Sequence, residues 1–448
     1  MNKISTPIAD FVKNYADSGI SRLHMPAHKG NSLLGCESLD ITEIKGADVL
    51  YSANGIIEES ENNASLLFGT EHTFYSTEGS TLAIKAMLAL IKKNAPNSAK
   101  ILATRNVHKA FVYACALLDI DVEWIYPEAS EHLCDCNLTP NALRDKLNSL
   151  NALPCALYVT SPTYLGKILD IRGLSSVCRE FGIYLLVDNA HGAYLAFEKP
   201  SAHPIALGAD ICCDSAHKTL PTLTGGAYLH ISKSFAPYNK GEVRDMLSLF
   251  ASTSPSYLIL QSLDLTNAYL ADGYAERLLR VESKIASLKS ELVAMGFNCE
   301  GDESLKIVVT NKSGVYSCKS LAEHLRNFHI EPEYAECDAL VLMLSTESSE
   351  IDFERIKSAF ATFSDNYPLK QCKHPVFVAP KRAISIREAL FLPSERIPTH
   401  TSLGRICASP SVSCPPAIPP IISGEIIDSD TINVLLYYGI DEIDVIKE

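Results

Sequence analysis

Three chemically capable side chains, Ser215, His217 and Lys218, follow a strand-like apolar run within residues 209–219. Sheets of the α/β class bind their ligands at the carboxyl ends of parallel strands, so a lysine at this position can take part in chemistry. Most lysines that follow a strand are solvated surface residues, and Lys218 alone therefore indicates little. A second reactive group has to support it.

Asp188 is that second group. It ends the apolar run 184–188 and is followed by the sequence Asn-Ala-His-Gly. A carboxylate at the end of a buried strand needs a partner, because an unpaired buried charge is costly. Pyridoxal phosphate (PLP) requires a lysine that forms a Schiff base and an aspartate beside its pyridinium nitrogen. The two segments together therefore predict a PLP site.

A phosphate cradle should accompany such a site. Gly79, Ser80 and Thr81 open a predicted helix and offer amides, hydroxyls and the positive end of a helix dipole. The alternative is an ordinary helix cap. His108 has two interpretations as well, since it is either a loop residue satisfied by hydrogen bonds or a ring that stacks on a flat cofactor.

The elements that would position these residues alternate along the chain from about residue 80 to 230. Short apolar or β-branched runs are separated by helical patterns, which predicts strands joined by crossover helices in a mainly parallel sheet. The predicted strands are 100–103, 156–160, 184–188, 210–213 and 226–231, and the predicted helices are 81–92, 109–118 and 174–181.

A long helix is predicted from Tyr274 to Leu292, because its apolar residues form one stripe and Gly296 follows as a stop. A connecting helix packed on a domain is favoured over a coiled-coil partner. Strands at 306–310 and 340–345 and helices at 320–328 and 352–363 then predict a smaller α+β domain. Beyond Asn366 prolines become more frequent, and a small third unit is predicted there. Within it, residues 414–420 are predicted to form an extended segment.

The composition is that of a soluble globular protein. The 39 basic and 53 acidic residues give a net charge of −14, which argues against non-specific nucleic-acid binding. The first 20 residues lack the pattern of a signal or transit peptide, and no apolar run approaches the roughly 18 residues of a membrane span. We expect a cytoplasmic protein that contacts neither membrane nor nucleic acid.

The 14 cysteines are interpreted as reduced thiols, because they are spread over a large chain without an export signal. The close pairs Cys134/Cys136 and Cys212/Cys213 lack further ligands at zinc spacing. No metal is predicted.

These segments resemble the ornithine/lysine/arginine decarboxylases, PLP enzymes of the aspartate aminotransferase fold (fold type I), and most closely the shorter bacterial members. The resemblance covers nearly the whole chain. The Asp188 and Lys218 motifs are shared broadly among PLP enzymes of this fold, whereas the opening and closing motifs are more specific. The motifs are residues 24–30, 40–43, 48–50, 79–81, 105–109, 161–166, 188–192, 215–218, 254–257, 415–419 and 424–425.

The resemblance implies a PLP-binding α/β large domain with a mainly parallel sheet, a smaller α+β domain and a small C-terminal domain of the decarboxylase family. We place an N-terminal arm at residues 1–25 and these three domains at 26–265, 266–366 and 367–448. It also implies a homodimer or higher homo-oligomer with shared active sites, in which residues 254–257 reach the partner's site.

Residue roles follow from the same resemblance. Lys218 would form the internal aldimine, Asp188 would salt-bridge the pyridine nitrogen and His108 would stack on the ring. The phosphate would be held by Ser80, Thr81, Ser215 and His217, with Ala190 beneath the ring and His191 at its border.

The implied reaction is decarboxylation of lysine, ornithine or arginine to the corresponding di- or polyamine precursor. The protonated pyridine, maintained by Asp188, accepts the electron pair left by carbon dioxide. Either His217 or Lys218 returns a proton to the α-carbon. Glu425 is the candidate acidic group for the cationic side chain of the substrate, and the alternative is a solvated surface glutamate.

The chain departs from the family pattern at Ala27, Cys414 and Ala417, where glycine, tyrosine and glycine are usual, and also at Asn31 and Ser423. Replacing glycine by alanine costs more than about 1 kcal/mol only where φ is positive. These positions lie outside the proposed PLP contacts, so they concern the choice of substrate and not the cofactor.

Two other functions compete with this one. Another fold type I PLP enzyme, an aminotransferase or a lyase, would share the fold, because fold does not fix reaction. An aminotransferase normally carries a carboxylate-binding arginine late in the small domain, where Arg326 and Arg355 lie in predicted helices without a motif. The second competitor is a non-catalytic PLP-binding sensor.

Overall fold

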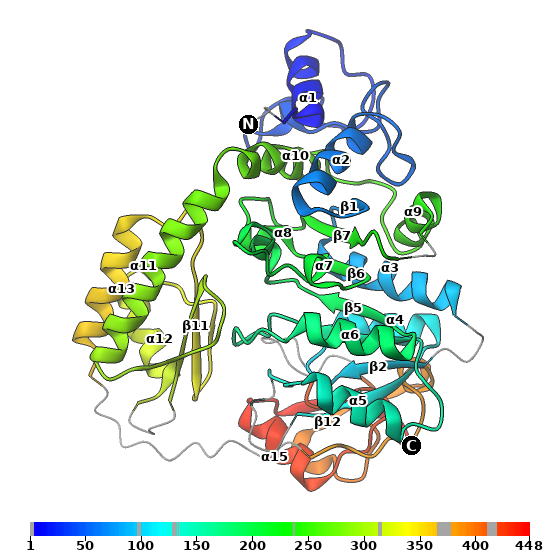
Figure 1. The fold of residues 1–448 in the computed structure, drawn as a ribbon, viewed down its shortest axis with the longest axis vertical. Helices are drawn as coiled ribbons and strands as arrows, with labels where there is room; N and C mark the ends of the chain where they lie inside the picture. Colours follow the sequence, from blue (N-terminus) through cyan, green and yellow to red (C-terminus); the bar gives the residue numbers. More distant parts are fainter. Residues whose placement is uncertain are drawn as a thin grey trace. The chain divides into compact units, whose positions relative to one another are not determined.

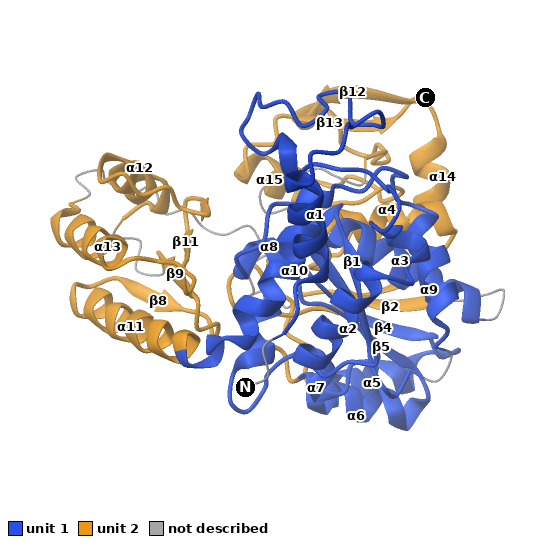
Figure 2. Cartoon of the chain, turned by 90° about the horizontal axis from the view of Figure 1, so that it is seen from above, with its two compact units in different colours: residues 1–99, 140–158, 171–276 blue, residues 100–139, 159–170, 277–448 orange. Residues whose placement is uncertain are grey.

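The fold is described by a computed structural model, in which residues 4–95, 100–127, 132, 134–235, 238–311, 316–364, 378–409 and 419–448 are described (Figure 1). The chain divides into two compact units, and each of them combines segments that are separate in sequence (Figure 2). Unit 1 comprises residues 1–99, 140–158 and 171–276, and unit 2 comprises residues 100–139, 159–170 and 277–448. The four-part domain division expected from the sequence stays a prediction.

The strands of unit 1 are ordered β1-β7-β6-β5-β4. In the parallel pair β5/β6, Asp188 lies opposite Cys213, so both strands end at one edge of the sheet. The strand β7 is antiparallel to β6 and to β1, because only a short helix and a turn separate it from β6. The bounds are β1 (His72–Ser76), β4 (Ala156–Thr160), β5 (Tyr184–Asp188), β6 (Ile211–Asp214) and β7 (Ala227–Ile231).

The helices of unit 1 bury apolar faces against this sheet. Helix α3 (Gly79–Asn94) has nine buried apolar residues and contacts β6 and β7. Helix α6 (Ile171–Phe181) packs on β5 and joins it to β4, which is the crossover expected for parallel strands. The remaining helices are α1 (Pro7–Asp17), α2 (Ile56–Phe68), α5 (Pro140–Ser149), α7 (Pro204–Leu207), α8 (Ala216–Thr219), α9 (Lys240–Ser248) and α10 (Tyr257–Ala271).

Helix α1 is held by a carboxylate from a distant part of the chain. The N–H groups of Ile8 and Ala9 each donate to Oδ2 of Asp264, at 2.9 Å. Ser60 donates to its other oxygen at 2.6 Å. Because the neighbouring Thr6 makes no side-chain cap, Asp264 takes over that role for the first turn. Burial raises the pKa of Asp264 to about 6.

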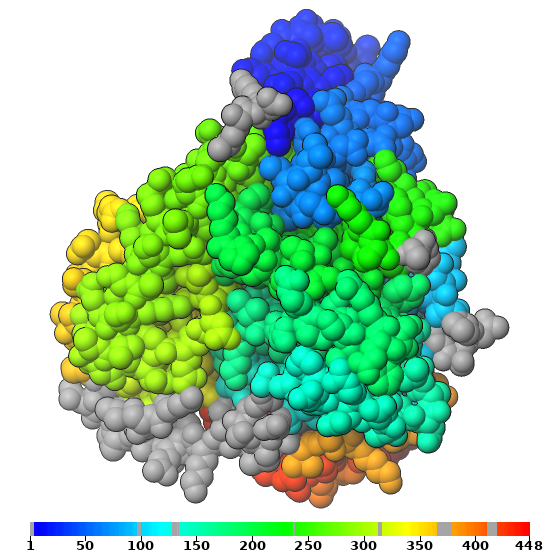
Figure 3. Space-filling view, in the orientation of Figure 1, coloured from blue at the N-terminus to red at the C-terminus, as the bar shows by residue number. Residues whose placement is uncertain are grey.

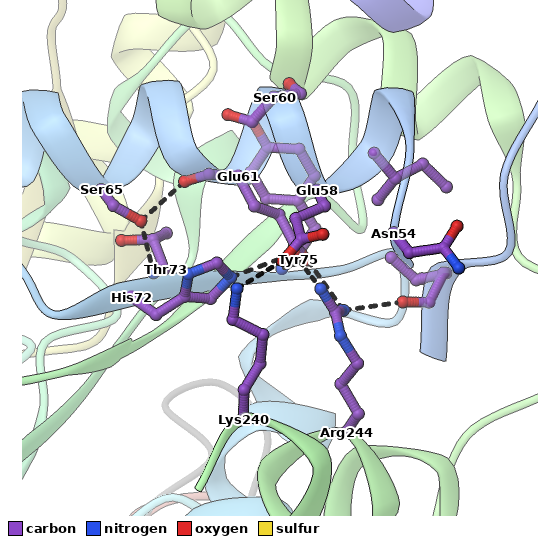
Figure 4. A network of polar contacts seen from close by, with 12 residues as sticks. Asn54, Glu58, Ser60, Glu61, Ser65, His72, Thr73, Tyr75, Lys240 and Arg244 are labelled. Carbon is purple, nitrogen blue, oxygen red and sulfur yellow. Dashed lines mark hydrogen bonds and ion pairs between the residues drawn. The ribbon is translucent and has the colours of Figure 1, made fainter. Parts of the chain in front are cut away.

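A buried ionic network fixes α2 to β1 and α9 (Figure 4). Glu61 is fully buried and accepts from Arg244 Nη2 at 2.7 Å, His72 Nε2 at 3.2 Å and the Tyr75 N–H at 3.0 Å. Arg244 also donates to the carbonyl of Leu50 at 2.9 Å. Removing one partner would leave an uncompensated buried charge, so the network locks three elements together.

Unit 2 contains the small sheet, ordered β10-β11-β9-β8. The apolar stripe of α11 (Tyr274–Ala294) is buried, as Leu278, Ile285 and Leu292 show, so the prediction of a connecting helix packed on a domain is confirmed. The other bounds are β8 (Asn298–Glu300), β9 (Lys306–Thr310), β10 (Tyr334–Ala335), β11 (Ala339–Met343), α12 (Cys318–Asn327) and α13 (Glu350–Thr362).

The remainder of unit 2 pairs early and late segments of the chain. The parallel strands β2 and β3 are joined by α4, on which α14 packs. Arg387 of α14 donates to the carbonyls of Ala116 and Leu117, at 3.0 Å each. The bounds are β2 (Lys100–Thr104), α4 (Lys109–Leu118), β3 (Asp121–Ile125), α14 (Ile386–Phe391), β12 (Ser394–Pro398), α15 (Ser429–Tyr437) and β13 (Glu442–Ile446).

The predicted α/β fold class is confirmed by these sheets. Of the departures from the family pattern, Ala27 has an ordinary backbone conformation, because the non-glycine residues with positive φ are Lys29, Asp48, Asp119 and His329. Cys414 and Ala417 lie outside the described residues. In the described ranges, no helix is both long enough and apolar enough to cross a membrane.

Candidate active site

Lys218 lies in α8, which begins two residues after β6 ends. Its Nζ is 3.0 Å from Nε2 of His191, and an ammonium group at that distance donates to the ring nitrogen. Ser215 precedes α8 and donates to Oγ of Ser80 at 2.8 Å. The structure therefore brings the predicted lysine next to one ring-bordering residue, and joins two of the predicted phosphate-binding hydroxyls.

Asp188 is the carboxylate at the same edge of the sheet, and only 2% of its surface is exposed. Tyr158 donates its hydroxyl to Oδ2 at 3.1 Å, and the N–H of Ala190 donates to Oδ1 at 3.2 Å. The thiol of Cys213 is 3.6 Å from Oδ1. All three donors are neutral, and within the described ranges no cationic side chain forms an ion pair with this carboxylate. Asp188 is thus available to a cation brought by a ligand.

The amino end of α3 is open to an anion. The helix begins at Gly79, whose φ of 69° favours glycine, and the side chain of Glu78 makes no capping hydrogen bond. Ser80 and Thr81 lie in the first turn, and Thr81 is exposed. The N–H of Gly79 donates to the carbonyl of Gly225 at 2.8 Å, and the positive end of a long helix attracts negative charge. The binding of the phosphate at this helix end stays a prediction.

His217 is oriented by the backbone of Gly226. A carbonyl can only accept, so Nδ1 of His217 carries the hydrogen of their 2.9 Å contact. Burial lowers the pKa of His217, and the charge of Lys218 lowers it further, while the Gly226 carbonyl acts in the opposite direction. The neutral imidazole then presents Nε2 as an acceptor.

His108 lies in unit 2, where it caps α4. Its Nδ1 accepts the N–H of Ala110 at 3.1 Å, which leaves the hydrogen on Nε2. The ring is partly exposed. His108 is therefore a hydrogen-bonded residue, as the first interpretation has it. Its stacking on a cofactor stays a prediction.

Glu425, also in unit 2, is buried in an ion pair, so the alternative of a solvated surface glutamate is wrong. Its Oε2 accepts from Arg105 Nη2 and from the N–H of Ile422, both at 2.9 Å. The guanidinium lies over the ring of Trp124, with 5.0 Å to the ring centroid. Burial raises the pKa of Glu425, and the charge of Arg105 opposes that shift.

A second carboxylate, Asp214, lies at this edge of unit 1 and was not predicted from the sequence. It ends β6 as Asp188 ends β5, so the signal that identified one could have identified the other. It accepts from Asn189 Nδ2 at 2.8 Å and from His203 and His230 at 3.0 and 3.1 Å. Tyr158 is the other missed residue, and a tyrosine within a buried strand gives no signal in the sequence.

The residues of unit 1 fit pyridoxal phosphate. An exposed lysine, a buried carboxylate with no cationic partner among the described residues and a helix end without a side-chain cap are the types of group that this cofactor needs. Ala190 and His191 come two and three residues after Asp188, in the turn that follows β5.

The chain belongs to the Orn/Lys/Arg decarboxylase family, whose major domain matches residues 6–346. This membership makes it a decarboxylase of a basic amino acid, and it favours decarboxylation over the aminotransferase alternative.

Full-length relatives agree with the family match. The chain is 28% identical over 469 residues to the arginine decarboxylase of Bacillus subtilis (strain 168), covering 97% of this chain and 94% of that protein. It is 28% identical over 456 residues to the arginine decarboxylase of Halalkalibacterium halodurans, covering 94% and 91%.

Solved structures share the fold. The lysine decarboxylase LdcF of Francisella novicida has a TM-score of 0.82 at 17% identity, covering 100% of this chain and 82% of that one. The serine palmitoyltransferase of Sphingomonas wittichii has a TM-score of 0.56 at 17% identity, covering 80% and 84%. The fold therefore extends beyond decarboxylases, as the predicted fold class requires.

Proposed function

We propose that this chain is a PLP-dependent arginine decarboxylase that supplies a polyamine precursor. The observation that carries the cofactor is Asp188, a buried carboxylate with only neutral donors, at the same sheet edge as Lys218. Bound PLP supplies an electron sink for the pair left on the α-carbon. The choice of arginine rests on the names of the curated relatives that match nearly the whole chain.

The residues of unit 1 would divide the work as follows. Lys218 holds the cofactor covalently and exchanges with the substrate amine. Asp188 keeps the ring nitrogen protonated, because a nearby anion favours the charged form. Ser80, Thr81 and Ser215 bind the phosphate at the amino end of α3, and His217 supports them. Ala190 and His191 border the ring, and His108 of unit 2 is proposed to stack on it.

Lys218 is the better proton donor to the α-carbon. His217 has its Nδ1 hydrogen engaged with Gly226, and its lowered pKa keeps Nε2 without a hydrogen near neutral pH. Lys218 has transferable protons and a neighbouring base, Nε2 of His191, at 3.0 Å. These contacts support Lys218 over His217 as the proposed proton donor.

Glu425 stays the proposed acceptor for the guanidinium of the substrate. Its Oε2 is occupied by Arg105 and Ile422, whereas Oε1 makes no hydrogen bond to the described residues. Because the charge of Arg105 offsets that of Glu425, Glu425 would bind the substrate guanidinium mainly through directed hydrogen bonds and less through net charge.

We further propose a cytoplasmic homodimer. Leu23, Leu33 and Leu34 are 92%, 89% and 88% exposed, in the N-terminal segment drawn in deep blue in Figure 3. Such exposed apolar residues are typical of interaction surfaces. In the segment 254–257, Tyr257 is buried and donates to the Asp48 carbonyl at 2.8 Å, so Ser254 is the residue free to reach a partner subunit.

The test incubates PLP-loaded protein separately with labelled arginine, lysine and ornithine, and measures carbon dioxide and the amine product. Arginine should give the highest kcat/KM. Lys218→Ala should abolish product and the absorbance of the lysine-linked cofactor, while the control Lys233→Ala, at an exposed position, should keep both. Product from lysine or ornithine alone would overturn the choice of arginine, and a Lys218→Ala protein with unchanged turnover would overturn the site.

A further inference from the structure

A buried cluster of hydrogen bonds lies behind the candidate active site in unit 1. Its centre is Asp214, the last residue of β6, which is fully buried. Oδ2 accepts from Nε2 of His203 at 3.0 Å and from Nε2 of His230 at 3.1 Å. Oδ1 accepts from Nδ2 of Asn189 at 2.8 Å. The three partners come from the cap of α7, from β7 and from the turn after β5, and each of them is fully buried.

The protonation states of the cluster can be assigned from its contacts. Nδ1 of His203 accepts the N–H of Ile205 at 3.3 Å, so the hydrogen of the neutral ring is on Nε2 and points to Asp214. Burial alone would raise the pKa of Asp214, but the two imidazoles outweigh it and hold the pKa below its ordinary value. Burial lowers the pKa of His230. Asp214 is thus an anion among neutral donors.

The same three side chains, His203, Asp214 and His230, are close enough to suggest a metal centre, since their ligand atoms lie within 4.8 Å of one another. A metal needs the lone pair of Nε2, and in His203 that nitrogen carries the hydrogen because Nδ1 is an acceptor. Asn189 already occupies the other carboxylate oxygen. The contacts therefore describe a hydrogen-bond cluster.

The cluster joins the two segments that carry the proposed PLP contacts. Asn189 directly follows Asp188, and Asp214 directly precedes Ser215 and α8. The N–H of Asn189 also donates to the carbonyl of Cys213 at 2.9 Å. A Cβ at Gly192 would lie 2.0 Å from Oδ1 of Asn189, so glycine is required for this side chain to turn toward Asp214.

We propose that Asp214 is a positioning residue that fixes the turn bearing Asp188 and His191 relative to the helix bearing Lys218. The inference rests on the proposed function, because both segments contact the cofactor there. The thiol of Cys212 also lies 3.6 Å from Oδ1 of Asp214. An ionised carboxylate that accepts from two imidazoles, an amide and a thiol in a dry interior has a single arrangement, which is the preorganisation a covalent cofactor site needs.

Asp214→Asn tests this, with Asp210→Asn as the matched control. Asp210 precedes the same strand and joins the same two strands at their other end, through the N–H of Leu185 at 2.8 Å. In Asp214→Asn an amide faces two N–H donors. We expect its dissociation constant for PLP, measured by equilibrium dialysis, to rise at least tenfold, against less than twofold in the control.

A second readout does not need the cofactor. In the unloaded protein, amide hydrogen exchange of residues 189–192 and 215–219 should accelerate at least tenfold in Asp214→Asn and stay unchanged in Asp210→Asn. Equal exchange in the two variants would overturn the positioning role. A wild-type protein that binds no PLP would overturn the proposed function, while the exchange result would still decide the role of Asp214.

His230 provides variants for the case that Asp214→Asn does not fold. His230→Gln keeps a donor toward Asp214, whereas His230→Leu removes it. We expect PLP affinity within threefold of wild type for glutamine and at least a tenfold loss for leucine. Equal affinities would overturn the proposal. So would stoichiometric metal in the purified protein, measured by mass spectrometry, because a metal at this cluster would replace the hydrogen bonds.

Discussion

Asp188 and Glu425 are both carboxylates that are 2% exposed, and their partners differ in charge. Glu425 accepts from the guanidinium of Arg105, which itself lies over Trp124. Asp188 accepts from a phenol, an amide and a thiol, all of them neutral. The negative charge of Glu425 is therefore compensated by the protein. The negative charge of Asp188 has no cationic partner among the described residues, so a ligand can supply one.

Asp188 and Glu425 are distinguished by the charge of their partners. Burial alone does not separate the two carboxylates, because both have left water. The charge of their partners separates them, since a buried anion without a cationic neighbour costs stability unless a ligand supplies the charge.

The largest effect is expected for Asp188→Asn. An anion beside a titrating group shifts its pKa by up to about 3 units, and each unit corresponds to about 1.4 kcal/mol. We therefore expect kcat to fall by about 10³-fold, with the unfolding temperature of the unloaded protein unchanged or higher. Stopped assays with labelled arginine and calorimetry measure the two quantities. A less stable unloaded variant would show that the charge of Asp188 is compensated after all.

For substitutions of Glu425, the main expected effect is a loss of stability. Glu425→Leu leaves the Arg105 guanidinium buried without its partner and should lower the free energy of unfolding by about 3 kcal/mol. The double variant Arg105→Met, Glu425→Leu should recover most of that loss, because a well-packed apolar pair often replaces a buried ion pair without cost. Denaturant titration measures both. An unchanged KM for arginine in a folded double variant would rule out Glu425 as the substrate acceptor.

Asp264 is a further buried carboxylate with neutral donors, and its contribution to the free energy of unfolding should depend on pH. Its pKa of about 6 lies above that of a free carboxyl, so the folded chain binds this proton more tightly than the unfolded chain does. The stabilisation is full below about pH 4 and is lost as the pH rises through about 6, by on the order of 3 kcal/mol. Asp264→Asn should remove this slope of unfolding free energy, whereas Asp17→Asn, at an exposed position, should keep it.

The smallest effect is expected for an exposed ion pair of the same chemistry as Arg105 and Glu425. Arg144 Nη2 lies 2.9 Å from Oε2 of Glu180 at the surface of unit 1. Arg144→Ala should change the free energy of unfolding by less than about 1 kcal/mol, because water screens the pair. A loss of unfolding free energy as large as that of Glu425→Leu would contradict the interpretation that burial, and not the geometry of the ion pair, determines how much the pair stabilises the protein.

The sequence predicted the elements whose residues are uniformly apolar. The observed bounds of β4, β5, β9 and α4 coincide with the predicted ones, because apolar runs ended by polar residues mark strands and buried helices clearly. Strand β1 was not predicted, since His72, Thr73 and Ser76 interrupt its apolar pattern and find buried partners only in the folded chain. The direction of β7 was not predicted either, because composition does not encode it.

The lysine and the aspartate of the candidate site were predictable as a pair. Lys218 follows a strand and Asp188 ends one, and the two positions together indicate a ligand site. The cluster around Asp214 was not predictable, because His203 and His230 lie 11 and 16 residues away on separate elements and no fixed spacing connects them. The pairing of Arg105 with Glu425 spans 320 residues and likewise has no local signal.

The cap that Asp264 provides for helix α1 also constrains the order of events during synthesis. The two amides it accepts are separated from it by 256 and 255 residues. A ribosome that adds about 5 to 20 residues per second reaches Asp264 roughly 10 to 50 s after it has made α1. Throughout that interval the first turn of the helix has no carboxylate to accept its amides. The first turn of α1 is therefore secured only after about 256 further residues have been made.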